Sequence, residues 1–259
     1  MKLPHNTFKR GLRDGRQQIG IWNSMPGTLM ADVVASAGFD WVVIDTEHAV
    51  TDIPDTLGMM QAMAAWPVSA VVRPASNDTV MIKRCLDLGA QTLMIPYVQD
   101  ADAARAAVAA MRYAPRGVRG MAGATRATRY GLVADYFQRA EEELCLIVQV
   151  ETAEAIDRIE DIAAVDGVDA LFIGPADLAA SMGHPGDLSH PQVVAAIEGA
   201  IRRIVAAGKP AGILTLDPEF ARRCIEWGTR FTAVGMDIAV LAKGMRLLSA
   251  SFDDTRFRP

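Results

Sequence analysis

The chain has 259 residues, 51% of them hydrophobic, and a formal net charge of −5. This length suits one domain spanning residues 1–259, and the acidic balance excludes the strongly basic surface that a nucleic-acid partner requires. The chain opens without a signal-peptide pattern, no apolar run reaches the roughly 18 residues of a membrane span, and the three cysteines lack metal-ligand spacing, so we expect a cytoplasmic protein that binds small molecules.

Short apolar runs recur along the chain and predict eight β-strands, at residues 18–22, 41–45, 68–73, 91–96, 144–150, 170–174, 211–215 and 231–235. The segments between them have the 3.6-residue periodicity of helices. Strands that are apolar almost throughout are typical of a parallel sheet covered by helices. Eight such units favour a closed (β/α)₈ TIM barrel over an open sheet, and no GxGxxG turn follows the first strand.

The connection between the fourth and fifth predicted strands is longer than one helix and two loops require, so it must contain extra structure. Its middle, residues 112–131, has no acidic residue and five arginines: Arg112, Arg116, Arg119, Arg126 and Arg129. Three interpretations stay open: a site for an anionic substrate tail, a contact with a neighbouring subunit, and a solvated lid.

In a TIM barrel the active site lies at the C-terminal ends of the strands. Polar residues and a glycine-proline turn fall there in four of the predicted units: Asp45, Glu47, His48, Arg73, Gln149, Glu151, Gly174, Pro175 and Asp177. Because the strands are parallel, we expect these residues to share one mouth of the barrel.

Two of them, Glu151 and Asp177, are carboxylates from adjacent strands. Hard oxygen ligands of this number suit Mg²⁺ or Mn²⁺, with the remaining positions open to water and a bidentate 2-oxo acid. The alternatives are a charge favourable to a helix dipole for Glu151 and a helix cap for Asp177.

His48 directly follows a predicted strand, and Asp45 is placed to orient its ring and raise its basicity, as a general base needs. The alternative is a histidine in an ordinary loop. Arg73 ends an apolar strand, so its guanidinium either contacts an enolate or carboxylate oxygen in the mouth or is buried with a partner. The turn after Gly174 brings backbone N–H groups at a helix start, which can hold an anion.

The five lysines argue against Schiff-base chemistry, which needs an amine inside the mouth. Lys83 and Lys243 fall in helical segments, and Lys209 precedes the seventh strand at the opposite face. A divalent metal is therefore expected to do the electrophilic work, and no organic cofactor is expected.

Four segments carry a resemblance to a known family: AGFDWVVIDTEH (37–48), VVRPA (71–75), IVQVETAEAI (147–156) and LFIGPADLAASMGHPG (171–186). Together and in this order they resemble the 4-hydroxy-2-oxoheptanedioate and 2-dehydro-3-deoxyglucarate aldolases, metal-dependent class II pyruvate aldolases. The likeness spans nearly the whole chain. It implies reversible cleavage of a 4-hydroxy-2-oxo acid into an aldehyde and pyruvate, or an analogue such as hydroxypyruvate.

The resemblance also implies roles for single residues. Glu151 and Asp177 hold Mg²⁺, Mn²⁺ or Co²⁺, and His48 with Asp45 handles the proton of the cleaved alcohol. Substrate contacts are implied for Arg73, Gln149, Gly174, Pro175, the backbone of Ala176 and Asp177, and Leu216.

For the assembly, the resemblance implies a hexamer, a trimer of dimers that exchange their C-terminal helix, here residues 238–252. Asp87 matches a position that reaches a neighbouring subunit's site, although a helix-surface charge is the alternative. After His48 the chain reads AVTD, where relatives often have proline and asparagine, which puts the aldehyde range in doubt.

Two other functions remain as alternatives. A citryl-CoA-lyase-like enzyme would need a coenzyme A site, for which the sequence shows no feature. A non-catalytic pyruvate-binding barrel would be expected to lack one of His48, Arg73, Glu151 or Asp177, and all four are present.

Overall fold

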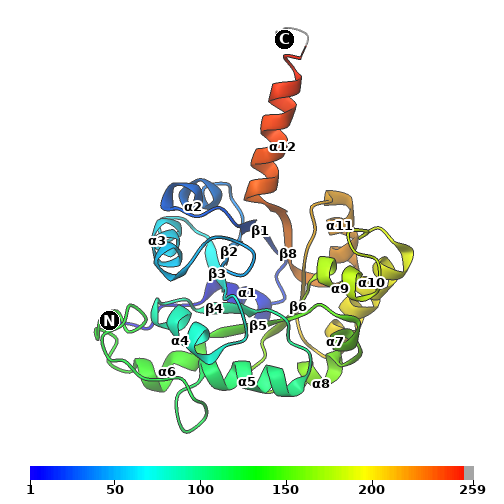
Figure 1. The fold of residues 1–259 in the computed structure, drawn as a ribbon. Coiled ribbons are helices and arrows are strands. Elements are labelled where there is room, and N and C mark those ends of the chain that lie inside the picture. The colour runs from blue at the N-terminus through cyan, green and yellow to red at the C-terminus, as the bar shows by residue number, and fades with distance from the viewer. Residues whose placement is uncertain (254–259) are drawn as a thin grey trace.

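The computed structural model describes residues 1–253, and its eight parallel strands close into a barrel (Figure 1). Consecutive strands are neighbours, and β8 pairs with β1 to close the ring. The strands are β1 Gln18–Asn23, β2 Trp41–Asp45, β3 Ser69–Arg73, β4 Thr92–Ile95, β5 Cys145–Val150, β6 Ala170–Ile173, β7 Ala211–Leu214 and β8 Thr229–Met236. The predicted (β/α)₈ barrel is confirmed, with strand ends within two residues of those expected.

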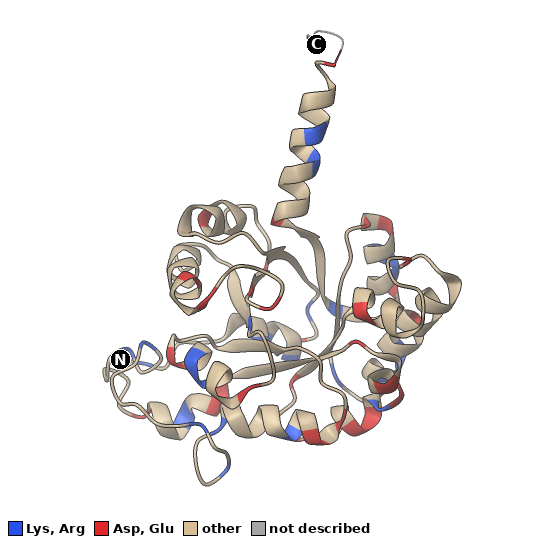
Figure 2. Ribbon diagram, viewed as in Figure 1, with Lys and Arg blue, Asp and Glu red and all other residues tan. Residues whose placement is uncertain are grey.

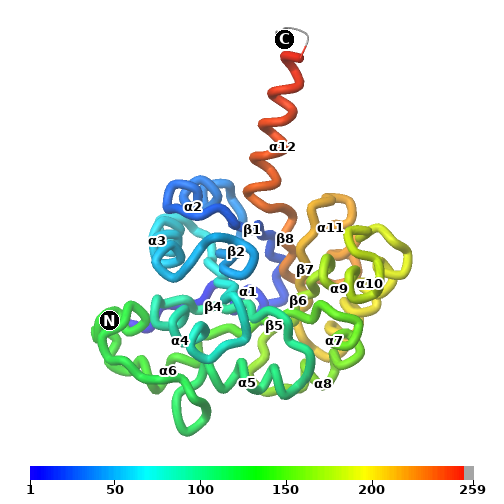
Figure 3. The backbone as a smooth tube through the Cα atoms, in the orientation of Figure 1, coloured from blue at the N-terminus to red at the C-terminus, as the bar shows by residue number. Residues whose placement is uncertain are grey.

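Helices connect the strands and surround the barrel (Figures 1 and 3). They are α1 Thr7–Arg13, α2 Thr28–Ala35, α3 Ile53–Met63, α4 Thr79–Asp87, α5 Ala101–Met111, α6 Tyr136–Glu143, α7 Ala153–Asp157, α8 Ile159–Ala163, α9 Pro175–Ser181, α10 Pro191–Ala206, α11 Pro218–Trp227 and α12 Asp237–Ala250. The connection between β4 and β5 holds both α5 and α6, which accounts for the extra structure expected there.

Aspartates begin four helices just after a strand: Asp52, Asp78, Asp100 and Asp217. Each carboxylate accepts a backbone N–H that the first helical turn leaves without an acceptor. These caps fix where the helices begin. They also place four negative charges on the end of the barrel where active sites lie.

The barrel interior is filled largely by aromatic rings, from Phe8, Trp22, Trp41, Phe172 and Phe231. Phe8 belongs to α1, and its ring centroid lies 5.7 Å from that of Trp41, so this helix closes the N-terminal end of the barrel. Gly20 leaves the space that the Trp41 ring occupies, because a Cβ there would overlap it. A packed aromatic plug therefore forms the floor beneath the C-terminal mouth.

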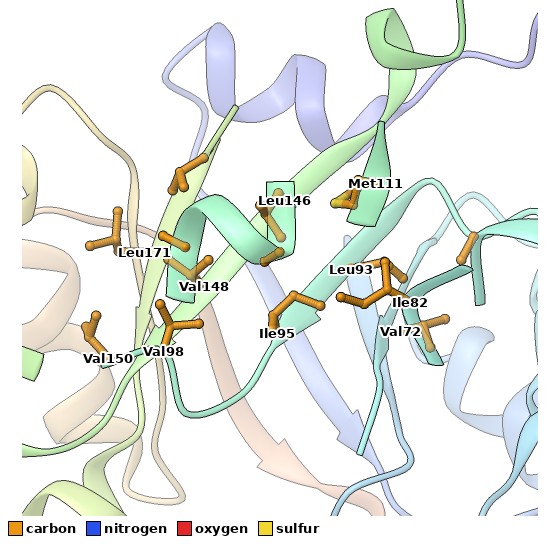
Figure 4. Packing of buried hydrophobic residues seen from close by; sticks show 14 of the residues in the cluster. Val72, Ile82, Leu93, Ile95, Val98, Met111, Leu146, Val148, Val150 and Leu171 are labelled. Atoms are coloured by element: carbon orange, nitrogen blue, oxygen red, sulfur yellow. The ribbon is translucent and has the colours of Figure 1, made fainter. Parts of the chain in front are cut away.

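A second apolar layer lies between the strands and the helices (Figure 4). Val72, Leu93 and Val148 belong to it and alternate along their strands with residues that face the interior. Since successive side chains of a strand point to opposite faces, the position within a strand decides which layer a residue joins. The same alternation positions the polar residues described below.

The arginine-rich segment, residues 112–131, packs against its own chain. Arg119 is buried and its guanidinium lies 2.9 Å from the Asp87 carboxylate, while Arg112 Nε lies 3.2 Å from Glu141. The segment follows α5, which runs away from the C-terminal ends of the strands. Within one chain it therefore covers no part of the mouth, and its contact with a neighbouring subunit stays a prediction.

The C-terminal helix α12 projects away from the barrel (Figure 1) and is mostly uncharged (Figure 2). Its one buried residue is Asp237, at its first position. Large apolar side chains are exposed along it, including Val240, Met245, Leu247 and Leu248. Within residues 1–253, no helix combines the length and the apolar character needed to cross a membrane.

Candidate active site

Polar side chains occupy the last inward-facing positions of three strands. Asp45 ends β2, Arg73 ends β3, and Gln149 lies near the end of β5, each two residues beyond an apolar side chain of the interior. Glu151 continues the same alternation just past β5 and is buried. Residues from distant parts of the chain thus meet above the aromatic floor.

Arg73 is the centre of this group. Its Nε and Nη2 donate to the Asp45 carboxylate at 2.9 and 2.7 Å, and its Nη1 lies 2.8 Å from Oε2 of Glu47. The Trp22 ring lies against the guanidinium, 5.2 Å from centroid to Cζ. Two carboxylates and a ring therefore fix the orientation of the planar cation.

Asp45 is fully buried, and its Oδ1 also accepts the backbone N–H groups of Glu47 at 3.0 Å and His48 at 3.3 Å. Burial acts to raise the pKa of Asp45, but the hydrogen bond and charge of Arg73 outweigh it and lower that pKa. The expected contact of Asp45 with the His48 ring is not formed within residues 1–253. Because Arg73 takes both carboxylate oxygens, Asp45 positions the His48 backbone, which corrects the sequence expectation.

Glu47 is a site residue for which the sequence pattern predicted no role. Besides its ion pair with Arg73, its Oε2 lies 3.9 Å from Nε2 of the exposed His48 ring. Burial raises the pKa of Glu47, and the charge of Asp177 adds to that rise. In the sequence, its position between Asp45 and His48, two residues with predicted roles, is the feature that could have identified it.

Glu151 is held through both carboxylate oxygens. Its Oε1 accepts the backbone N–H of Tyr97 at 2.7 Å, and its Oε2 accepts Nε2 of Gln149 at 2.9 Å. Gly174 packs against the same side chain, which a Cβ at that position would overlap. Oε1 of Gln149 in turn accepts from Nη1 of Arg73 at 3.5 Å, so one network connects β3 and β5.

Negative charge accumulates around Glu151. Burial raises its pKa to about 7, the N–H of Tyr97 opposes that rise, and the charges of Glu47 and Asp177 add to it. Carboxylates gathered in this way form a favourable environment for a cation.

This environment fits a divalent ion. Glu151 and Asp177 offer the hard oxygen ligands that Mg²⁺ and Mn²⁺ prefer. Among residues 1–253, no three or more His, Cys, Asp and Glu side chains are grouped as a ligand set. An ion here would take its other ligands from substrate and water, as Mg²⁺ does at open sites.

The remaining predicted substrate contacts lie at the same end of the barrel. Gly174 is the N-cap of α9 and Pro175 its first residue. Ala176 and Asp177 are exposed in the first turn, where backbone N–H groups have no acceptor within the helix. Leu216 follows β7 and is also exposed.

Asp87 lies apart from these residues, at the last position of α4 and at the other end of the barrel. Its carboxylate pairs with Arg119, and a quarter of its side chain is exposed. Within one chain it does not join the site. Its reach into a neighbouring subunit's site therefore stays a prediction that depends on assembly.

Comparison with known proteins gives the family. Residues 18–244 match the model described as HpcH/HpaI aldolase/citrate lyase, and the chain belongs to this family. A pyruvate aldolase of Rhizobium etli is 60% identical over 252 residues, which are 97% of this chain and 99% of the relative. A 4-hydroxy-2-oxo-heptane-1,7-dioate aldolase of Klebsiella pneumoniae is 49% identical over 249 residues, 96% of this chain and 94% of the relative.

Solved structures agree with this assignment. The crystal structure of an HpcH/HpaI aldolase/citrate lyase family protein from Burkholderia cenocepacia is similar to this chain with a TM-score of 0.91 and 40% sequence identity, covering 95% of this chain and 98% of the other. The family resemblance seen in the sequence is confirmed, and the curated relatives described above are named as aldolases, which are carbon–carbon lyases.

Proposed function

We propose that this chain is a divalent-metal-dependent pyruvate aldolase. It reversibly cleaves a 4-hydroxy-2-oxo acid into an aldehyde and pyruvate, or an analogue such as hydroxypyruvate. The observation that carries the proposal is the fixed Arg73 guanidinium, which pairs with Glu47 and is joined through Gln149 to Glu151, near the charge of Asp177, at one end of the barrel. The names of the relatives agree with this reaction.

Substrate binding divides among these residues. Glu151 and Asp177 are the proposed ligands of Mg²⁺, Mn²⁺ or Co²⁺, and such an ion supplies Lewis-acid polarisation of the 2-oxo group when bound. The free backbone N–H groups of Ala176 and Asp177 receive the substrate carboxylate. Gln149 forms hydrogen bonds with both Glu151 and Arg73 and so fixes their relative positions.

In cleavage, His48 accepts the proton of the C4 hydroxyl while the C3–C4 bond breaks, and the C4 oxygen becomes the aldehyde carbonyl. The electron pair of that bond moves to C3 and the C2 oxygen. Arg73 stabilises the negative oxygen of the resulting enolate. Addition of a proton at C3 then gives the methyl group of pyruvate.

A pyruvate-release assay over a panel of 4-hydroxy-2-oxo acids tests the function. We expect EDTA to abolish cleavage and Mg²⁺, Mn²⁺ or Co²⁺ to restore it. Borohydride added with pyruvate should trap no covalent adduct, because the site residues include no lysine. Full activity in a metal-free preparation, or pyruvate from none of the acids, would refute the proposal.

His48→Ala is expected to separate two partial reactions. If His48 acts on the alcohol proton, aldol cleavage should fall by about 10²–10⁴-fold, whereas exchange of pyruvate methyl protons in D₂O should fall much less. Nuclear magnetic resonance measures the exchange directly. Equal losses in both reactions, with metal still bound, would show that His48 also takes part in forming the enolate.

We further propose a hexamer, a trimer of dimers in which α12 is exchanged between subunits. The support is the exposed apolar surface of α12, which its own barrel leaves uncovered. Light scattering should give six times the 27.9 kDa chain mass. Val240→Asp combined with Leu247→Asp should lower that mass, and a wild-type monomer at micromolar concentration would contradict the assembly.

A further inference from the structure

Tyr97, two residues after β4, has a backbone conformation that its residue type disfavours. Its φ is +54°, in the left-handed region where the Cβ crowds the backbone. Glycine or asparagine adopts this conformation with less strain. The turn directs the Tyr97 N–H at Oε1 of Glu151, 2.7 Å away, so the backbone of Tyr97 has a clear purpose in the site.

The side chain of Tyr97 needs a separate explanation. It is 61% exposed, although Pro96 and Val98 on either side are buried. Within residues 1–253, neither a hydrogen bond nor a ring contact engages its phenol. Any residue except proline would supply the N–H, so a strained, exposed tyrosine without a partner points to a ligand as the reason for the ring.

The burial of the site residues indicates which half of the substrate the Tyr97 ring contacts. Ala176 and Asp177, proposed to receive the substrate carboxylate, are exposed after β6, whereas Arg73, Gln149 and Glu151, which serve the reacting 2-oxo group, are all at least nine-tenths buried. The aldehyde half must extend outward from them toward solvent. Because the backbone N–H of Tyr97 contacts Glu151 while its side chain is exposed, we place the ring on the solvent side of Glu151, along that outward path.

The surroundings indicate which aldehydes fit. Two more large apolar side chains are exposed where strands end at this face, Val50 after β2 at 84% and Leu216 after β7 at 56%. Four of the helix caps at this face are aspartates, as described above. Arg73 and Arg158 bring positive charge there, and each already pairs with two carboxylates.

We propose that Tyr97 is a specificity-determining residue that packs against the substituent of the aldehyde, and that the site prefers aldehydes with a neutral, apolar substituent to aldehydes that carry a carboxylate. The inference rests on the proposed aldolase function and names the substrate class of its second product. The apolar rim favours such a substituent, and the acidic surroundings repel a carboxylate.

The test compares three variants in aldol addition of pyruvate to pentanal and to 4-oxobutanoate, which have similar length. Tyr97→Asn tolerates the left-handed backbone, retains the N–H to Glu151 and removes the ring. Tyr97→Phe restores the ring. Trp66→Asn is the control, because Trp66 is also an exposed aromatic residue but lies between α3 and β3, at the opposite end of the barrel.

We expect wild-type kcat/KM to be about tenfold or more higher for pentanal than for 4-oxobutanoate. Tyr97→Asn should raise the KM for pentanal about tenfold. The variant's rate of aldol addition should fall clearly more than its rate of pyruvate methyl-proton exchange. Tyr97→Phe should restore a KM for pentanal close to that of the wild type, and Trp66→Asn should match the wild type.

Several results would overturn the inference. One is an unchanged KM for pentanal in Tyr97→Asn, and another is a preference of the wild type for 4-oxobutanoate. A third is an equal fall of aldol addition and proton exchange in Tyr97→Asn, which would mean that Tyr97 acts only through Glu151. A wild-type enzyme that neither exchanges pyruvate protons nor adds pyruvate to either aldehyde would overturn the aldolase function as well, and the exchange measurement distinguishes this case.

Discussion

Glu151→Gln is expected to lower aldol cleavage by about 10²–10³-fold or more, because a neutral amide replaces the negative ligand of the proposed ion. The substitution retains the size of the side chain and an oxygen for the Tyr97 N–H, so the fold should persist. Calorimetric titration with Mn²⁺ should show weaker binding, and excess metal should restore part of the activity. Unchanged metal affinity would exclude Glu151 as a ligand.

The same substitution should stabilise the metal-free protein at high pH. Burial raises the pKa of Glu151 from its ordinary 4.5 to about 7. The stability that this carboxyl contributes is fully present below its unfolded pKa near 4.5 and is lost as the pH rises through 7, when the folded state must hold a buried charge. The Glu151→Gln variant has a neutral side chain at this position, so its stability does not fall in this pH range for this reason.

Thermal unfolding in EDTA between pH 5 and pH 8 measures the difference. Relative to Glu151→Gln, the wild type should lose on the order of 5 °C in Tm across this range. Added Mg²⁺ should reverse the difference at pH 8, since a bound cation compensates the buried charge. Parallel Tm curves for the two proteins in EDTA would contradict a raised pKa at Glu151.

Arg73→Lys is expected to lower both aldol cleavage and pyruvate methyl-proton exchange by about 10²–10³-fold, because the enolate that Arg73 stabilises is common to both reactions. Lysine retains the positive charge but cannot make the two-pronged contact with Asp45. Alanine is a poorer choice, because it would leave Asp45 buried without its partner at a cost of about 3–5 kcal/mol.

Arg158→Lys is the matched control for this experiment. Arg158 also pairs with two carboxylates at the same face, but its side chain is 44% exposed and belongs to no part of the proposed site. We expect it to leave both reactions unchanged. If Arg73→Lys retained full proton exchange, the proposed contact between Arg73 and the enolate oxygen would be wrong.

Much of the fold could be predicted because it depends on local patterns. The runs 41–45 and 144–150 are apolar except for Asp45 and Gln149, which is the signature of strands buried on both faces, and both became barrel strands. The extra length between the fourth and fifth strands likewise predicted added structure, which is α6 with the segment before it. Eight such units in alternation have few ways to close other than a barrel.

The location of the site followed from the same patterns. All C-terminal strand ends of a parallel barrel lie on one face, and the two-residue alternation turns Asp45, Arg73 and Gln149 inward together. No knowledge of individual contacts was needed for this step. The sequence therefore determined which residues gather at the mouth and that two carboxylates are available there for a metal.

Only the tertiary structure decided which of these residues bond to one another. Asp45 pairs with Arg73, 28 positions away, instead of the nearby His48 ring, and Glu151 takes a backbone N–H from Tyr97, 54 positions away. Asp87 pairs with an arginine 32 positions away at the far end of the barrel. Spacing along the chain cannot rank such competing partners, because hydrogen-bond distance and burial are set by how separate strands and loops pack together.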